Sequence, residues 1–422
     1  MKSEPEVLNP NLLLEPTFHQ TDEKYKLWQI MRNNYPIFFH QHDDFPVCYS
    51  ITRYEDVKRV YKDPSLFSSA KGVLLRTNKQ GEDPGANLTL ALTDPPKHRK
   101  LRDIASKWFS ASYVKMIEFE VMQQIKTLFF TALSNGGCDI TQDVTSPLTL
   151  SVTCSILGVP ESQHKAVLRC CHEAFTNGTA LINNKDFMIF ISEFMQYKQL
   201  NPGNDLASAI ILAFIDDKKL TEKEILLNFE NLIGATENAS LSLSSGILAM
   251  IKYKENMKLL KKDRSLMPLA IDEILRWASS ASHSMRTVTK DMMFYDKKLF
   301  AGDKVLLWLP SANRDQSIFD QPDLFDISRS PNPHLALGYG EHFCIGNLLG
   351  KMQARLLLSE ILDSNLEIEL DSPPQFLSSI HVNGPEYLPI KITDSYSFMI
   401  IMNDFLLMVL DYSSLASLIG FI

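Results

Sequence analysis

Apolar residues recur at spacings of three and four over much of the chain, which is typical of helices that bury one face. Four stretches carry the pattern: "YEDVKRVYKD" (54–63), "EFEVMQQIKTLFFTALSN" (118–135), "EKEILLNFENLIGATENASLSLSSGILAMI" (222–251) and "MPLAIDEILRWASS" (267–280). Strand-like runs are short and few, for example Val47–Thr52 and Lys304–Pro310. The pattern predicts a mainly α fold with small β-sheets.

Composition and charge narrow the class of protein. The chain has 422 residues, of which 45% are hydrophobic, so it can bury a large core. Neither a repeat nor a low-complexity linker divides it, and a single domain over residues 1–393 is expected. A formal net charge of −8 and a sequence pI near 5.7 argue against a nucleic-acid partner.

The two ends of the chain and its cysteines bear on its location. The start, "MKSEPEVLNPNLLLEP", is acidic where a secretory signal would be basic, so export is not expected. The cysteines form neither an even framework nor a CxxC pair, which favours a cytoplasmic protein with reduced thiols. Residues 394–422 are strongly apolar, but Asn403, Asp404 and Asp411 interrupt them. A packed or interfacial helix is therefore favoured over a membrane span.

One cysteine stands in a glycine-rich stretch, "HLALGYGEHFCIGN" (334–347). Gly338 and Gly340 permit turns with positive φ, and Gly346 lets the backbone approach a flat partner closely. Residues 344–362 have the pattern of a helix that begins just after the cysteine, and its free amides can stabilise a buried thiolate. Cys344 is thus a candidate ligand beneath a large planar cofactor. The alternative is a small buried apolar residue between two turns.

The segment "LGYGEHFCIG" (337–346) resembles the haem-binding loop of the cytochrome P-450 family. The resemblance implies that Cys344 is the metal ligand of haem b in a haem-thiolate monooxygenase of the soluble bacterial type, with the cytochrome P-450 fold. Leu337 stands where the family usually has Phe, which weakens ring packing on the thiolate side. The resemblance covers residues 35–392, and "GPEYLPIKI" (384–392) is similar to the family's C-terminal strand segment.

Two further groups of residues match the family in order. Glu273 and Arg276 share one helix face, where a common surface ion pair is the alternative, and the resemblance implies a structural trio closed by Arg329. In "TDPPKHRKLR" (93–102), Asp94 is expected to cap a helix whose basic residues could hold an acid or form a solvated face. The resemblance implies that the haem propionates are bound by four residues, namely His98, Arg102, Arg286 and His342.

The segment "GATEN" (234–238) matches the family's central-helix motif of an acid followed by an alcohol. The resemblance makes Glu237 the acid and puts Asn238 at the alcohol position, and both are catalytic candidates because oxygen activation consumes protons. An amide is not a practical acid, so a bound water or a substrate hydroxyl is expected to complete the relay. The alternative for Asn238 is a polar residue on a solvent-facing helix surface.

By family analogy, the substrate pocket is lined by residues 69–92, 171–181, 281–285 and 378–382 and by the central helix near Asn231. These segments mix apolar residues with Asn231, His283 and His381. The mixture predicts an elongated small-molecule or carrier-bound substrate with few polar groups, a polyketide or peptide intermediate of secondary metabolism. The histidines could instead be satisfied within loops.

The resemblance also implies how electrons arrive. The haem domain uses up the chain, so electrons from NAD(P)H are expected through a separate ferredoxin or flavodoxin. A basic docking patch for such a partner is expected at Lys97, Arg99, Lys100 and Lys107. Two other functions stay open, namely oxidative coupling, desaturation or ring formation by the same haem, and a non-catalytic haem sensor or carrier.

Overall fold

The computed structural model describes residues 9–134, 136–176 and 181–393. The apolar segment 394–422 lies outside these residues, and so does the question of its packing. Within the described part of the chain, no helix is both long enough and apolar enough to cross a membrane. Helices dominate and the sheets are small, which confirms the fold class that the apolar spacing predicts.

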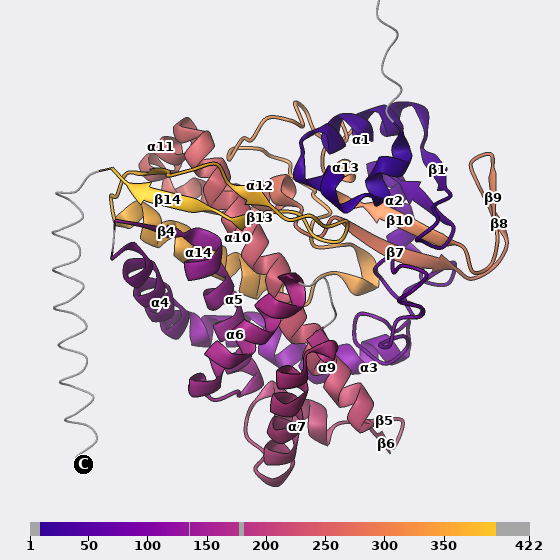
Figure 1. Cartoon of the computed structure of the whole chain (residues 1–422), viewed down its shortest axis with the longest axis horizontal. Helices are drawn as coiled ribbons and strands as arrows, with labels where there is room; N and C mark the ends of the chain where they lie inside the picture. The colour runs from indigo at the N-terminus through magenta and orange to yellow at the C-terminus, as the bar shows by residue number, and fades with distance from the viewer. Residues whose placement is uncertain (1–8, 135, 177–180, 394–422) are drawn as a thin grey trace, which may run out of the picture.

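The helices of the first half of the described chain are coloured from indigo to magenta in Figure 1. Their bounds are α1 (Glu23–Asn34), α2 (Tyr54–Lys62), α3 (Lys97–Ser106), α4 (Ala111–Leu133), α5 (Ser146–Leu157), α6 (Glu161–Thr176), α7 (Lys185–Leu200) and α8 (Leu206–Leu212). The helices that follow are α9 (Glu222–Gly234), α10 (Thr236–Lys252), α11 (Lys254–Lys262), α12 (Met267–Ala278), α13 (Leu309–Ala312) and α14 (Asn347–Asp363).

The largest sheet of the described residues has the order β1-β2-β10-β7-β3 and lies at the opposite end of Figure 1 from α7. Its strands are β1 (Ile37–His40), β2 (Cys48–Ile51), β3 (Phe67–Ser68), β7 (His283–Val288) and β10 (Lys304–Trp308). β10 pairs parallel with β2, whereas the other pairs are antiparallel. Two of these strands, β2 and β10, are the strands that the apolar runs predict.

The remaining strands form short sheets. One sheet has the order β11-β14-β4, from β4 (Gly137–Asp139), β11 (Ile368–Leu370) and β14 (Pro389–Ile392). Three hairpins pair β5 (Phe214–Ile215) with β6 (Lys218–Lys219), β8 (Met292–Phe294) with β9 (Lys297–Leu299), and β12 (Gln375–Phe376) with β13 (Pro385–Tyr387). The strands at 385–387 and 389–392 agree with the strand segment expected at the end of the family resemblance.

The central helical stretch differs from the continuous pattern of its sequence. It divides at Ala235, where α9 ends and α10 begins. The hydroxyl of Thr236 donates to the carbonyl of Ile233 at 2.7 Å, so a side chain satisfies a carbonyl at the point of the break. Periodicity of apolar residues does not register such a local bond, and the break falls inside the segment that carries Glu237 and Asn238.

The start of α3 also differs from the expectation. Asp94 does not cap this helix, because α3 begins at Lys97 after the residue Pro96. The carboxylate of Asp94 instead accepts a hydrogen bond from the backbone N–H of Ser69 at 2.9 Å and another from the Ser68 hydroxyl. Asp94 therefore ties the segment before α3 to the end of β3 and leaves the helix start without a side-chain cap.

The expected trio of Glu273, Arg276 and Arg329 is present. Arg276 donates from Nε to Glu273 Oε2 at 2.7 Å and from Nη2 to Oε1 at 2.8 Å, the bidentate geometry that the helix spacing allows. Arg329 donates from Nε to the same carboxylate at 3.1 Å. All three side chains are buried, so the surface-pair alternative is wrong. The trio links α12 to the segment that leads into the Cys344 loop.

Candidate functional site

The Cys344 loop is built as its glycines indicate. Gly338 and Gly340 both have φ of 72°, and a Cβ on Gly340 would lie 3.0 Å from the carbonyl oxygen of Tyr61. The loop thus needs glycine both for its turns and for its contact with α2. Gly346 precedes α14, which begins at Asn347, somewhat later than the position directly after the cysteine that its pattern suggests.

The thiol of Cys344 lies close to the N-terminus of α14. Burial raises its pKa, whereas a hydrogen bond from the backbone N–H of Gly346 and the charge of Arg102 act to lower it. The loop holds the cysteine in place through its own backbone, since Cys344 N donates to the Leu337 carbonyl at 2.9 Å. The other cysteines lie outside this loop, and burial raises the pKa of each of them.

Two histidines meet beside this loop. The rings of His98, on α3, and His342, in the loop, are 4.1 Å apart between centroids. Burial lowers the pKa of His98 and lowers that of His342 to about 3. The His98 Nδ1 and His342 Nε2 atoms are buried, and neither has a hydrogen-bond partner among the described residues. Two unsatisfied ring nitrogens side by side are an incomplete polar site.

Two arginines add positive charge to the same region. Arg286, on β7, is buried and donates only to Ser284 Oγ at 2.7 Å and to the carbonyl of Met285 at 2.8 Å. Arg102, on α3, is half-buried, and the charges of both arginines lower the pKa of His342. Neither guanidinium forms an ion pair with a carboxylate of the described residues. The structure therefore brings together all four residues expected around the propionates.

The two catalytic candidates, Glu237 and Asn238, come from the break in the central helix. Asn238 is half-buried, and its Oδ1 has no hydrogen-bond partner within the described chain. A solvated side chain would not leave a buried acceptor unpaired, so the solvent-facing alternative for Asn238 is not supported. Burial and the charge of Glu386 raise the pKa of the neighbouring Glu237 to about 7.

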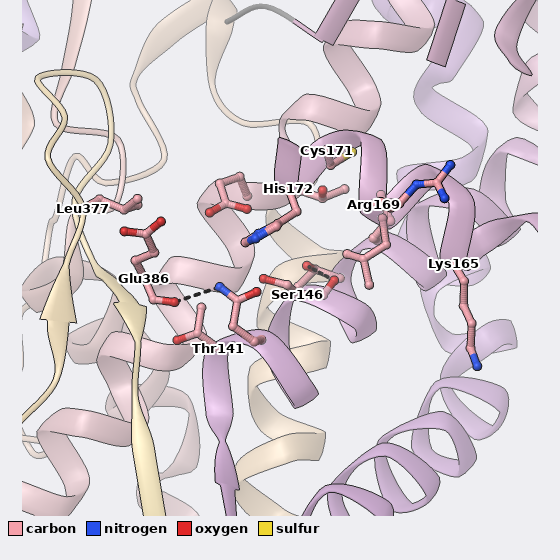
Figure 2. A pocket seen from close by; sticks show the side chains of 14 residues that line it. Thr141, Ser146, Lys165, Arg169, Cys171, His172, Leu377 and Glu386 are labelled. Carbon is pink, nitrogen blue, oxygen red and sulfur yellow. Dashed lines mark hydrogen bonds between the residues drawn. The ribbon is translucent and has the colours of Figure 1, made fainter. Parts of the chain in front are cut away.

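Glu237 borders a pocket of about 280 Å³ that sequence reasoning does not indicate (Figure 2). The pocket lies between α5, α6, the start of α10 and the hairpin of β12 and β13. Figure 2 shows Glu386 and His172 directed into it from opposite sides, whereas Lys165 and Arg169 point away from Glu386. Glu386 stands far from Glu237 in the sequence, and only the strand segment 384–392 signals that it belongs to the fold.

The residues expected to line the substrate pocket differ in whether their polar atoms have hydrogen-bond partners. His283 accepts a hydrogen bond from the Leu75 N–H at Nε2 and lies 2.9 Å from the Ile380 carbonyl at Nδ1, so both of its nitrogens are used inside the protein. His283 is therefore satisfied within the protein, which agrees with the alternative that these histidines do not bind substrate. His381 packs beside it at 5.2 Å between ring centroids and keeps an unpartnered Nδ1. Arg76, which no motif indicates, likewise keeps an unpartnered Nε.

The expected basic patch on and after α3 is largely engaged within the protein. Lys97 pairs with Glu224 at 2.9 Å, and Lys100 and Arg99 pair with Asp216 and Glu341. Lys107 donates to the side-chain oxygen of Asn204 at 2.7 Å. A count of cations along the sequence does not include the carboxylates that folding brings beside them. Three of the four positive charges are therefore already balanced locally.

Comparison with known proteins agrees with this geometry. A family model for cytochrome P450 matches residues 185–385. The chain is 31% identical over 369 residues to a methyl-branched lipid omega-hydroxylase of Mycobacterium bovis, covering 81% of this chain and 83% of the relative. It is 29% identical over 390 residues to cytochrome P450 NovI of Streptomyces niveus, covering 90% and 96% of the two chains.

Solved structures show the same fold. The crystal structure of P450 OxyD, involved in the biosynthesis of vancomycin-type antibiotics, superposes with a TM-score of 0.82 at 24% identity, covering 90% of this chain and 98% of that one. CYP109E1 from Bacillus megaterium, solved in complex with testosterone, gives a TM-score of 0.78 at 26% identity, covering 89% and 100%.

The chain therefore belongs to the cytochrome P450 family. It is a monooxygenase that uses haem b and receives electrons from NAD(P)H indirectly, through separate redox proteins. The haem site, the oxygen chemistry and the need for a partner were all implied by the loop around Cys344.

Proposed function

We propose that Cys344 is the thiolate ligand of the haem iron and that Arg102, Arg286, His98 and His342 bind the haem propionates. The supporting observation is that two buried ring nitrogens without partners, His98 Nδ1 and His342 Nε2, gather beside the thiol with two guanidinia that have no carboxylate partner among the described residues. Two propionates are the complement of such a site, since buried cations and donors need acceptors. When bound, the haem supplies the reductive activation of O₂.

The protein's part in that chemistry begins with control of the thiolate. The Gly346 N–H donates to the sulfur, which stabilises negative charge there and keeps it on one atom. Glu237 holds a proton near neutral pH, because burial and a neighbouring negative charge raise its pKa to about 7. Asn238 presents an unpartnered amide oxygen that can hold a water for onward transfer.

We infer that the substrate is an intermediate of secondary metabolism with a mostly apolar body and a few polar groups. The polar atoms available to it are Arg76 Nε, Asn238 Oδ1 and His381 Nδ1, which are buried and unpartnered among the described residues. Buried polar atoms of this kind are satisfied by a ligand or by water. Two relatives are named for mostly apolar substrates, a steroid and a methyl-branched lipid, which supports a substrate of this kind.

Oxidative coupling, desaturation or ring formation is the second candidate outcome. The observation that favours it is Asn238, which supplies no hydroxyl for proton delivery. Product analysis with a bound metabolite separates the outcomes, because only oxygen insertion adds an atom from ¹⁸O₂ to the product. A non-catalytic haem sensor or carrier would form no product at all when supplied with electrons.

For the redox partner we propose an acidic ferredoxin or flavodoxin that docks at the C-terminal end of α2. Arg59 and Lys62 are exposed there, and no carboxylate of the described residues pairs with either. Lys58 and Lys62 lie over the ring of Tyr339, 5.5 Å and 5.6 Å from its centroid, which places them beside the Cys344 loop. Exposed cations beside the thiolate would steer an acidic partner to the shortest path for electrons.

The decisive experiment for the haem ligand replaces Cys344 with His in the full chain. The reduced, carbon monoxide-treated variant should lose the red-shifted band of a thiolate-bound haem, while Cys138→Ser, a cysteine of similar exposure, should retain it. Retention of the band by Cys344→His would overturn the assignment. A screen of candidate metabolites against the haem spectrum of the unaltered protein, followed by turnover with a reductase system, then tests the substrate class.

A further inference from the structure

The pocket beside Glu237 is lined by polar and apolar residues, and it extends from a half-buried residue to exposed ones. Glu237 is half-buried at its inner wall, and Lys165, Arg169 and His172 are exposed on α6 at its outer side. Its volume of about 280 Å³ has room for several waters, since one occupies about 30 Å³ in the liquid. The pocket therefore connects bulk solvent with the carboxyl group of Glu237.

Helix geometry separates the two catalytic candidates. Thr236 and Glu237 line the pocket, whereas the next residue, Asn238, does not. Successive side chains of a helix point in directions about 100° apart, so Glu237 stands between the pocket and the face that carries Asn238. A proton that enters through the pocket can reach the Asn238 side by way of the Glu237 carboxyl.

Among the described residues that line the pocket, Glu386 is the charged group that acts on Glu237. Glu386 acts on Glu237 through its negative charge, and Glu237 makes no ion pair or hydrogen bond with another described residue. The cations of the wall do not offset this charge. Arg169 already pairs with Glu173 and Asp186, and Figure 2 shows the side chains of Arg169 and Lys165 directed away from Glu386.

The other titratable groups that line the pocket all come from α6. Cys171, on α6, stays a neutral thiol because burial and nearby negative charges raise its pKa. His172 is exposed and faces the pocket opposite Glu386. The lining residues of α5 and of the segment before it, Thr141, Gln142, Ser146 and Thr149, carry no charge but offer hydroxyl and amide groups to water.

We propose that this pocket, which both Glu237 and Glu386 line, is the solvent inlet for protons to Glu237, and that Glu386 is a positioning residue that holds the proton on the Glu237 carboxyl. Glu237 releases one proton toward Asn238 and takes one back from a pocket water, which is replenished from bulk solvent past Glu386 and His172. This inference rests on the proposed function, because it assumes that Glu237 serves oxygen activation. It adds a residue from β13 and an entry path that the motif itself does not contain.

The backbone holds Glu386 in place independently of its charge. The amide of Gln142 donates from Nε2 to the Glu386 carbonyl at 2.9 Å, and β13 pairs with β12. Glu386→Gln therefore removes the charge while keeping the fold of the strand. Glu386→Asp keeps the charge and serves as the conservative rescue. Glu367→Gln removes a carboxylate from an exposed position before β11 that does not line the pocket, and it is the matched control.

The primary measurement is an infrared titration of the protonated carboxyl band in the ferric holoenzyme, without substrate. Glu237→Gln identifies the Glu237 band by its loss. Glu386→Gln should move the titration midpoint to lower pH by about one unit, because a nearby like charge raises a carboxyl pKa by this order. Glu386→Asp should restore the midpoint, and Glu367→Gln should leave it unchanged.

A kinetic consequence has a defined sign. A lower pKa leaves less Glu237 protonated at a given pH above the midpoint, so the alkaline limb of kcat should move to lower pH in Glu386→Gln. Peroxide release per electron pair should rise over the same range. A midpoint that is unchanged in Glu386→Gln, or a band unaffected by Glu237→Gln, would overturn the inference. Because the titration needs no turnover, this result is separate from failure of the proposed ligand assignment, which the carbon monoxide spectrum reports.

Discussion

The buried trio on α12 allows one stability prediction to be worked out from its bonds. Glu273→Gln preserves the size of the side chain but removes the charge that faces Arg276 and Arg329. The carboxylate accepts from Arg276 at 2.7 and 2.8 Å, from Arg329 at 3.1 Å, and from two neutral donors, the Asp326 N–H at 2.9 Å and Asn332 Nδ2 at 3.1 Å. None of these bonds is shared with solvent on the carboxylate side, since the Glu273 side chain is 0% exposed.

Loss of one partner from a buried charged network costs about 3–5 kcal/mol, because the remaining charges stay desolvated without compensation. Here two guanidinia would remain. They would still be held by backbone oxygens, since Arg276 also donates to the Asn313 and Pro322 carbonyls at 2.8 Å and Arg329 to the Asp320 carbonyl at 2.6 Å. The variant should therefore fold, and its free energy of unfolding should fall by about 3–5 kcal/mol.

The assay is urea unfolding followed by far-ultraviolet circular dichroism, with the haem absorbance recorded in parallel. The matched control is Asp363→Asn, which breaks the Arg264–Asp363 pair of 2.8 Å between largely exposed side chains. An exposed pair contributes below about 1 kcal/mol. If Glu273→Gln costs no more than Asp363→Asn, the trio is not the structural element described here, and the reasoning from burial fails.

Three further outcomes are expected. Asn238→Thr should raise the yield of product per electron pair for substrates that lack a hydroxyl, measured as product against peroxide, and equal coupling of hydroxylated and deoxy substrates in the unaltered enzyme would contradict the proposed relay. Removal of residues 394–422 should leave the haem content of the purified protein unchanged, because every described residue of the haem site lies upstream; a soluble truncated chain without haem would refute this. Charge reversal by Arg59→Glu with Lys62→Glu should slow haem reduction by an acidic ferredoxin and weaken its salt dependence, as stopped-flow rates would show. The same reversal at the paired Lys100 is the control and should do less. Rates that do not change in the Arg59→Glu, Lys62→Glu variant would exclude docking at α2.

The local parts of the site could be predicted from the sequence. The Cys344 loop is a contiguous motif whose glycines serve turns within a few residues, and both Gly338 and Gly340 adopt the positive φ that this requires. Glu273 and Arg276 lie one helical turn apart, so their pairing follows from helix geometry. Predictions of this kind succeed because the interacting groups are near neighbours along the chain.

Interactions between distant segments could not be predicted in the same way. Asp94 caps no helix because its carboxylate is taken by Ser68 and Ser69, and Lys97 is no free cation because Glu224 lies beside it. Glu386 reaches the surroundings of Glu237 only through the folding of a hairpin. In each case a polar group has several possible partners, and the choice among them is made by tertiary packing.

The two sets of buried arginines show how structure separates a structural role from a binding role when the sequence does not. The guanidinium groups of Arg276 and Arg329 donate to the carboxylate of Glu273, which the protein itself supplies. Arg286 is as fully enclosed as a core residue, yet burial lowers its pKa and no carboxylate of the described residues pairs with it. An uncompensated buried charge costs several kcal/mol, so a ligand that brings negative charge to Arg286 would stabilise the protein. Because the charge of Arg286 acts on His342, whose ring contacts that of His98, we infer that the carboxylates of the haem supply the missing negative charge there.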